Sequence, residues 1–122
     1  MLFRSVFPCA TGDEAYRGSA VETIEGVRLI KEALPGCTTI LGISNVSFGL
    51  PCRQLINDVF LILAVEAGAG SALIDPTSSS LSEVFSIDRS ASTFQLAEDV
   101  LLGRDEYCAR FIRAYRKGEL TA

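Results

Sequence analysis

The residues with the clearest chemical potential lie in one short stretch, 40–51, where an apolar run gives way to polar side chains. The run ends at Ile43, and Ser44, Asn45 and Ser47 follow it. The carboxamide of Asn45 can donate and accept hydrogen bonds at once, which suits an amide-rich heterocycle whose ring nitrogen changes its proton or charge state. The competing interpretation is a turn asparagine that bonds its own backbone. Spacing alone leaves both open, so Asn45 is a candidate binding and catalytic residue.

A second polar residue, Asp75, stands at the end of the next apolar segment. Parallel strands bring their carboxyl ends to one face, where ligands bind, so Asp75 is expected to open onto the same face as Asn45. Its alternative role is an Asx turn before Pro76. Ser47 is expected to brace the loop and is, with Asp75, a weaker candidate for the rim of a binding site. Phe48 either packs beneath the next helix, the role we favour, or forms a wall for a flat ligand.

Several kinds of chemistry are disfavoured by what the sequence lacks. Histidine is absent, which all but excludes a Ser/His/Asp or Cys/His catalytic arrangement. The glycines at 68 and 70 follow a helical segment and not a strand, so they indicate a helix end and not a phosphate-binding loop. A zinc site is not expected, because the cysteines are far apart and form no CxxC pair. They are Cys9, Cys37, Cys52 and Cys108.

Composition and charge indicate a folded protein and argue against binding to nucleic acid or insertion into a membrane. With 48% apolar and 21% charged residues the chain is typical of a folded protein. A formal charge of −4, with Arg and Lys scattered along the chain, argues against nucleic acid as a partner. The longest apolar run, Val59 to Val65, is well short of the roughly 20 residues that span a bilayer. We therefore expect no membrane segment, and reduced, buried thiols in a cytoplasmic protein.

Helical and strand patterns alternate along the chain. Apolar residues at helical spacing, capping residues and terminal glycines predict helices over 19–34, 51–67, 80–85 and 92–103, and a last helix capped by Asp105. Apolar, β-branched runs predict buried strands over 38–43 and 71–74, with the tail of another strand near 6–8. Pro51 is expected in the first turn of its helix, and Ser92 with Gln95 as a capping box. Tyr115 is expected on the same face of the last helix as Cys108, Phe111 and Ile112.

This order of elements is typical of the α/β class with a parallel sheet. Two buried strands and a fragment of a third form a poor sheet, because a stable sheet usually has three or more strands. A complete (β/α)₈ barrel needs about 250 residues. The 122 residues are therefore expected to form the C-terminal portion of a TIM-type barrel. Its exposed strand edges favour association, so a homodimer is one expected state.

The stretch 40–51, Ile-Leu-Gly-Ile-Ser-Asn-Val-Ser-Phe-Gly-Leu-Pro, resembles the signature of the pterin-binding domain of methyltetrahydrofolate methyltransferases. That family includes cobalamin-dependent methionine synthase and the methyltransferases that serve corrinoid proteins. Further similar segments are Phe-Pro-Cys-Ala-Thr-Gly-Asp at 7–13, Glu-Thr-Ile-Glu-Gly at 22–26 and Val-Phe-Leu at 59–61. The resemblance covers nearly the whole chain after Ser5.

The resemblance implies a TIM-type barrel related to dihydropteroate synthase, with the pterin ring bound at the carboxyl ends of the strands. It implies that Asn45 hydrogen-bonds near N5 of methyltetrahydrofolate, whose methyl group passes to cob(I)alamin on a separate corrinoid domain or protein. Some relatives have a glutamine in place of Phe48, so one polar contact is missing here. Asp75 matches an aspartate in some members and an asparagine in others. The acids that bind pterin on earlier strands have no counterpart in this sequence.

Two other functions stay open at this point. The chain is either part of the working methyltransferase or a non-catalytic fragment that binds folate weakly, or packs against a partner chain. A dihydropteroate synthase-like enzyme is disfavoured, because no lysine-bearing pyrophosphate motif occurs near the last strands. Residues 1–5 carry no cap, turn or targeting signal, and we interpret them as a non-native leader. Residues 6–122 are then the partial pterin-binding barrel domain.

Overall fold

Three short parallel strands form the sheet of this protein. The computed structural model describes residues 2–3, 19–36, 39–73 and 81–120. Strand β2 (Ile40–Gly42) lies between β1 (Leu2–Phe3) and β3 (Ser71–Leu73). Ile40 is aligned with Leu2 on one side and with Ser71 on the other. The parallel pairing of the two expected strands is therefore confirmed, although β2 is shorter than the sequence pattern suggested.

The edge strand β1 was not expected where it is. It lies within residues 1–5, the segment interpreted as a non-native leader, and it pairs with β2 through Leu2 and Phe3. The strand tail expected near 6–8 falls outside the described residues. Whether the leader is native stays a prediction, because strand pairing by two residues has no bearing on their origin.

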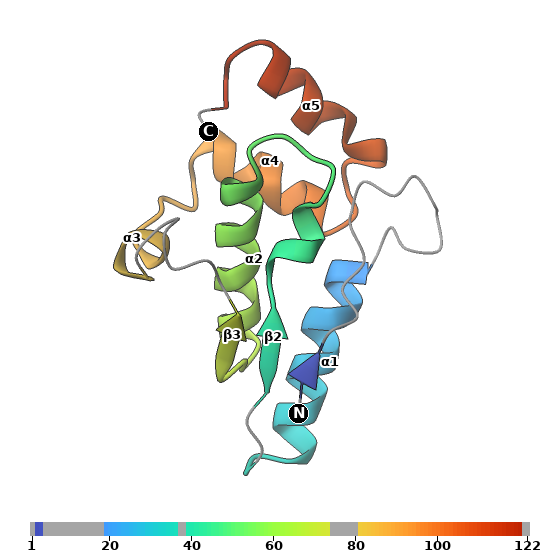
Figure 1. Ribbon diagram of the computed structural model, residues 1–122, viewed down its shortest axis with the longest axis vertical. Coiled ribbons are helices and arrows are strands. Elements are labelled where there is room, and N and C mark those ends of the chain that lie inside the picture. The colour runs from blue at the N-terminus through green and yellow to red at the C-terminus, as the bar shows by residue number, and fades with distance from the viewer. Residues whose placement is uncertain (1, 4–18, 37–38, 74–80, 121–122) are drawn as a thin grey trace.

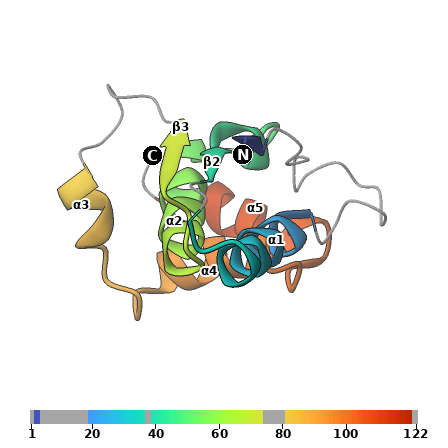
Figure 2. The same ribbon diagram turned by 90° about the horizontal axis from the view of Figure 1, so that it is seen from below.

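Helices follow the strands in the expected order. They are α1 (Ser19–Ala33), α2 (Arg53–Glu66), α3 (Leu81–Phe85), α4 (Ser92–Leu101) and α5 (Ala109–Arg116), with 3₁₀ turns η2 (Ser44–Ser47) and η3 (Glu106–Cys108). Figure 1 shows α1 and α3 on opposite sides of α2, and Figure 2 shows the strands on one side of α1, α2 and α4. The described residues thus form an α/β arrangement in which helices cover one face of a parallel sheet.

Two details of the helix starts differ from expectation. Helix α2 begins at Arg53, and its N-cap Cys52 has left-handed backbone angles (φ 50°, ψ 46°), so Pro51 lies before the helix and not in its first turn. Helix α4 is preceded by Ala91 as its N-cap, with no side-chain capping bond, so the capping box expected from Ser92 and Gln95 is wrong.

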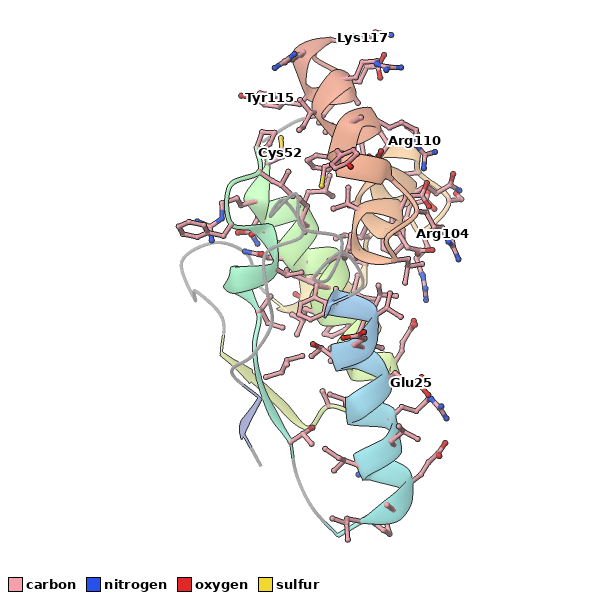
Figure 3. The ribbon with its side chains drawn as sticks, turned by 90° about the vertical axis from the view of Figure 1, so that its right-hand side faces the viewer. Glu25, Cys52, Arg104, Arg110, Tyr115 and Lys117 are labelled. Atoms are coloured by element: carbon pink, nitrogen blue, oxygen red, sulfur yellow. The ribbon has the colours of Figure 1, made fainter. Side chains whose placement is uncertain are left out.

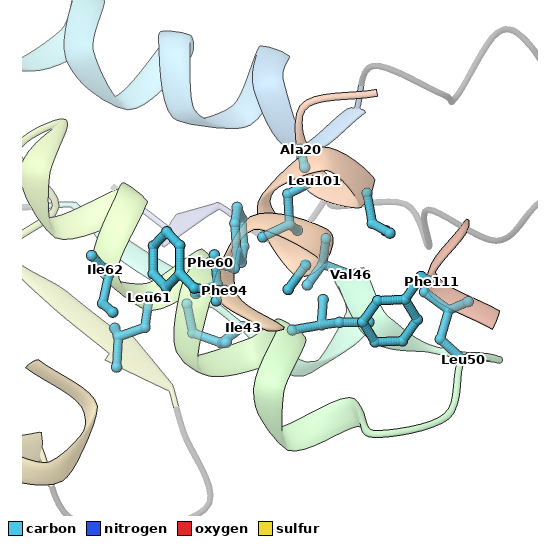
Figure 4. Packing of buried hydrophobic residues seen from close by; sticks show 14 of the residues in the cluster. Ala20, Ile43, Val46, Leu50, Phe60, Leu61, Ile62, Phe94, Leu101 and Phe111 are labelled. Atoms are coloured by element: carbon cyan, nitrogen blue, oxygen red, sulfur yellow. The ribbon is translucent and has the colours of Figure 1, made fainter. Parts of the chain in front are cut away.

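The core is centred on α2. Its buried residues are Ile56, Val59, Phe60, Leu61, Ile62 and Ala64, which occupy more of the helix circumference than a single stripe. A helix that is apolar on most sides is surrounded by other elements, and here α1, α3, α4 and the loop before α2 supply them. Figure 4 shows the resulting cluster, in which Phe60 and Phe94 lie beside Ile43 from the end of β2.

The C-terminal helix is fixed by Asp105, as expected, but from farther away than a normal cap. Its two carboxylate oxygens accept the backbone N–H groups of Arg110 and Phe111, each at 2.9 Å. Phe111 is buried, whereas Tyr115, four positions later, is 46% exposed, so the neighbouring elements cover the start of this face and not its end. Figure 3 shows Arg110 and Tyr115 projecting from opposite sides of α5.

Candidate functional site

The candidate site is built on the turn that follows β2. After Gly42 the chain places Ile43 in the core and turns into η2, which carries Asn45. The backbone N–H of Val46 donates to the carbonyl of Ile43 at 3.4 Å, and that of Leu50 donates to the carbonyl of Ser47 at 3.0 Å. The side chains of Val46 and Leu50 are buried. Figure 4 shows both side chains in the core cluster, so the turn is attached to the hydrophobic core through these two residues.

Ser47 is the best-defined polar residue of this turn. Its side chain is fully buried (0% exposed). The hydroxyl donates to Oδ1 of Asn57 at 2.7 Å and accepts from Nε of Arg53 at 3.1 Å. Buried polar groups require such partners, because an unsatisfied hydroxyl would lose its bonds to water. Ser47 therefore braces the loop, as the sequence suggested.

Phe48 lies immediately after η2 and does not pack beneath α2. Its side chain is 62% exposed, and the guanidinium carbon of Arg53 lies 5.4 Å from the centroid of its ring. The expectation of Phe48 as a packing residue is therefore wrong. Its exposed ring stays available for the alternative role, a wall for a flat ligand. A guanidinium at this distance from an aromatic ring is attracted by the ring's quadrupole.

Asn45 and Asp75 are related through the sheet. Gly42, at the end of β2, is aligned with Leu73 at the end of β3, so both strands end at the same edge of the sheet. Asn45 lies three residues beyond the first strand end, in η2. Asp75 follows the second strand end by two residues and lies outside the described part of the chain. The structure thus brings Asn45 and Ser47 into one turn, and strand register alone relates Asp75 to them.

Two residues of the site were missed by sequence reasoning, namely Arg53 and Asn57. Both lie at the start of α2, four positions apart, and side chains at this spacing share one face of a helix. That spacing directly after the polar turn was the available signal. The signal is weak, because polar residues at this spacing are also typical of a helix face that is exposed to solvent.

The rest of the described chain adds no metal or membrane feature. No group of three His, Cys, Asp or Glu side chains gathers among residues 2–3, 19–36, 39–73 and 81–120. Within the same ranges, every helix is too short or too polar to cross a bilayer.

Burial and the nearby Asp105 carboxylate raise the pKa of the Cys108 thiol to about 11, so this thiol stays protonated and unreactive near neutral pH.

Comparisons with known proteins identify relatives of the chain. No family model matches it. It is 39% identical over 97 residues, 80% of its length, to the methylcorrinoid:tetrahydrofolate methyltransferase of Eubacterium limosum. It is 47% and 46% identical over 70 residues, 56% of its length, to the methionine synthases of Mycobacterium tuberculosis and Mycobacterium leprae.

These matches cover only part of each relative. The chain spans 31% of the Eubacterium limosum enzyme and 6% of each methionine synthase. The identities are nevertheless high over most of the chain, and they agree with the resemblance found at residues 40–51. The chain is therefore homologous to a segment of the methylcorrinoid:tetrahydrofolate methyltransferase and of the two methionine synthases, and the matches support a fragment of their family.

Proposed function

We propose that this chain supplies part of the pterin site of a methyltransferase that exchanges the N5 methyl group between methyltetrahydrofolate and a corrinoid. The barrel in which it works is a TIM-type (β/α)₈ barrel of the dihydropteroate synthase kind. The three parallel strands with helices on one face are consistent with a sector of such a barrel. The corrinoid, cob(I)alamin before it takes the methyl group, is carried by a partner domain or protein.

The chemistry sets a clear requirement at N5. When the bond between N5 and the methyl carbon breaks, its electron pair stays on N5, and an amine is a poor leaving group unless it receives a proton. Hydrogen bonds that strengthen as the charge on N5 changes lower the barrier, because they stabilise the transition state more than the ground state. A carboxamide meets this requirement in both directions, since it offers an acceptor oxygen and a donor nitrogen.

The roles follow from the positions of the residues. Asn45 is the proposed pterin ligand and catalytic residue, hydrogen-bonded near N5. Asp75, which follows the neighbouring strand end, is a second pterin ligand on the same edge. Ser47, although it belongs to the pterin site, acts by holding the turn, because its hydroxyl is buried and bonded to Asn57 and Arg53.

The direction of transfer is a property of the partner and not of this turn. The Eubacterium limosum relative is named for transfer from a methylcorrinoid to tetrahydrofolate. Transfer from methyltetrahydrofolate to cob(I)alamin is the same step in reverse and passes through the same transition state. The groups that stabilise charge at N5 therefore serve both directions.

One observation carries the proposal: Asn45, within the stretch 40–51 that resembles the family signature, lies in a turn at the carboxyl end of the central parallel strand. Ligands of parallel βα folds bind at this edge. The reduced thiols expected from the sequence are consistent with a cytoplasmic enzyme. A homodimer stays a prediction, which the sedimentation of the purified chain would test.

Calorimetric titration of the whole chain with methyltetrahydrofolate tests the proposal. We expect saturable binding that Asn45→Ala weakens about two- to tenfold, the effect of losing one neutral hydrogen bond of about 0.5–1.5 kcal/mol in the ground state. Gln95→Ala is the matched control, because it removes an exposed amide from α4.

No binding at millimolar ligand, or equal binding by wild type and Asn45→Ala, would reject the site. Absence of binding would favour the second function, a non-catalytic fragment. Condensation of p-aminobenzoate with a pterin pyrophosphate would instead favour the dihydropteroate synthase-like enzyme.

A further inference from the structure

We propose that Arg53 and Asn57 are positioning residues that hold the turn carrying Asn45 in its binding geometry. The inference rests on the proposed function for what the turn binds. It goes beyond that function because it states which two side chains of α2, Arg53 and Asn57, keep the turn in a fixed conformation. We call Arg53, Asn57 and the Ser47 hydroxyl between them the clamp.

The turn needs such a support because of its own geometry. A 3₁₀ turn of four residues has poorly aligned internal hydrogen bonds and is short-lived on its own. A residue that must meet a ring nitrogen in the transition state has to be held within a fraction of an ångström, and an error of 1 Å costs about 100-fold in rate. The backbone bonds and the buried side chains of Val46 and Leu50 fix the two ends of the turn, and the Ser47 hydroxyl is a further point of attachment between them.

The clamp acts on one buried atom, the hydroxyl oxygen of Ser47. The Ser47 hydroxyl donates to Asn57 at 2.7 Å and accepts from Arg53 at 3.1 Å, so both partners hold the same oxygen. Arg53 and Asn57 are four residues apart in α2 and share a face of a helix that the core surrounds. The turn is thus joined by two directional bonds to α2, the helix on which the core is centred.

Ordinary helix capping does not explain these contacts. The N-cap of α2 is Cys52, whose left-handed backbone forms no side-chain capping bond. A capping hydroxyl accepts from backbone N–H groups of the first helical turn. Ser47 instead bonds two side chains, one of them ten residues along the chain. The bonds therefore serve the position of the turn and not the start of the helix.

Arg53 also holds the residue after the turn. Its guanidinium lies 5.4 Å from the centroid of the exposed Phe48 ring while its Nε bonds Ser47. One side chain thus fixes both the buried end of the turn and the ring that follows it. Replacing Arg53 with lysine would keep the charge and lose the planar group that makes both contacts.

The test uses four variants of the whole chain and two measurements. Asn57→Leu removes the acceptor at similar volume, and Asn57→Asp keeps an acceptor oxygen. Arg53→Met removes the guanidinium, and Arg89→Met is its matched control, because Arg89 lies 5.4 Å from the ring of Phe94, away from η2. The measurements are calorimetric affinity for methyltetrahydrofolate and hydrogen exchange of the backbone amides of Val46 and Leu50.

We expect Asn57→Leu and Arg53→Met to weaken binding about two- to tenfold, no more than Asn45→Ala does, and to speed exchange at Leu50. Asn57→Asp should bind close to wild type, and Arg89→Met should change neither readout. In a Ser47→Ala background, Asn57→Leu should cause no further loss of affinity, because the shared oxygen is already gone. Rescue by the conservative variant separates positioning from a general loss of folding.

Three results would overturn the clamp. They are unchanged exchange and affinity in both Asn57→Leu and Arg53→Met, an equal loss in Arg89→Met, or fully additive losses with Ser47→Ala. If wild type does not bind methyltetrahydrofolate at all, the proposed function fails, and exchange at Leu50 alone still decides whether the clamp holds the turn. Should Asn57→Leu not fold, Arg53→Met decides the question, because its side chain is exposed.

Discussion

Asp105 is predicted to hold the C-terminal helix to the rest of the protein, so its removal should destabilise the whole fold. Its carboxylate is 6% exposed and accepts the N–H groups of Arg110 and Phe111 at 2.9 Å each. The N-cap of α5, Cys108, makes no side-chain capping bond. In Asp105→Ala both helix N–H groups lose their carboxylate partner, and the buried Phe111 loses its anchor.

The size of the effect follows from the number and type of bonds. A helix cap contributes about 0.5–2 kcal/mol, and a hydrogen bond to a charged group about 1.5–3 kcal/mol. Two bonds that share one carboxylate are not independent, so we expect a loss of about 2–4 kcal/mol in the free energy of unfolding. With 122 residues, a loss of about 3 kcal/mol lowers the melting temperature by roughly 12 °C. Asp105→Asn keeps one acceptor and should fall between wild type and Asp105→Ala.

Urea unfolding followed by circular dichroism measures this loss, and Asp99→Asn is the matched control. The Asp99 carboxylate is 23% exposed and lies 3.7 Å from Arg104 and 3.4 Å from Arg110. Figure 3 shows both arginines projecting outward, away from β2. Exposed ion pairs of this kind contribute about 0–1 kcal/mol. A loss in Asp105→Ala no larger than that in Asp99→Asn would refute the reasoning.

Two further predictions concern backbone strain and pH. Gly68 has φ +111°, and a Cβ there would lie 2.9 Å from Cγ of Lys31, so Gly68→Ala should cost about 1–2 kcal/mol. Adding Lys31→Ala, which removes the flexible contact, should recover little of that loss in urea unfolding. The pKa of Cys108 is raised from 9.0 to about 11 by burial and by the nearby Asp105 charge. Between pH 9 and 11 the unfolded thiol therefore ionises first, and stability should fall as pH rises, more in wild type than in Cys108→Ala. Equal losses in the two proteins over that range would contradict this cause.

Local sequence patterns were sufficient for the order of the elements. Apolar residues at helical spacing placed α1, α2 and α4 to within a few residues, and the apolar runs placed β2 and β3 as neighbouring parallel strands. Gly68, with its positive φ just past the end of α2, ends that helix as expected. These features depend on neighbours close in sequence, so the sequence alone carries them.

The candidate site was predictable only in outline. Asn45 and Ser47 share a turn at the end of β2, as the change from apolar to polar residues indicated. The exposure of Phe48 and the contacts made by Arg53 and Asn57 were not predictable. They depend on how the loop crosses the start of α2, and no local spacing specifies that crossing.

The same division holds across the protein. Its sequence by itself determined the order of the helices and of strands β2 and β3, the edge at which polar residues gather and the family to which the chain is related. Only the tertiary structure decided that the carboxylate of Asp105 reaches the N–H groups of Arg110 and Phe111, and that Tyr115 faces outward. The reason is physical: helical periodicity fixes which residues share a face, whereas the packing of distant elements fixes which face is covered.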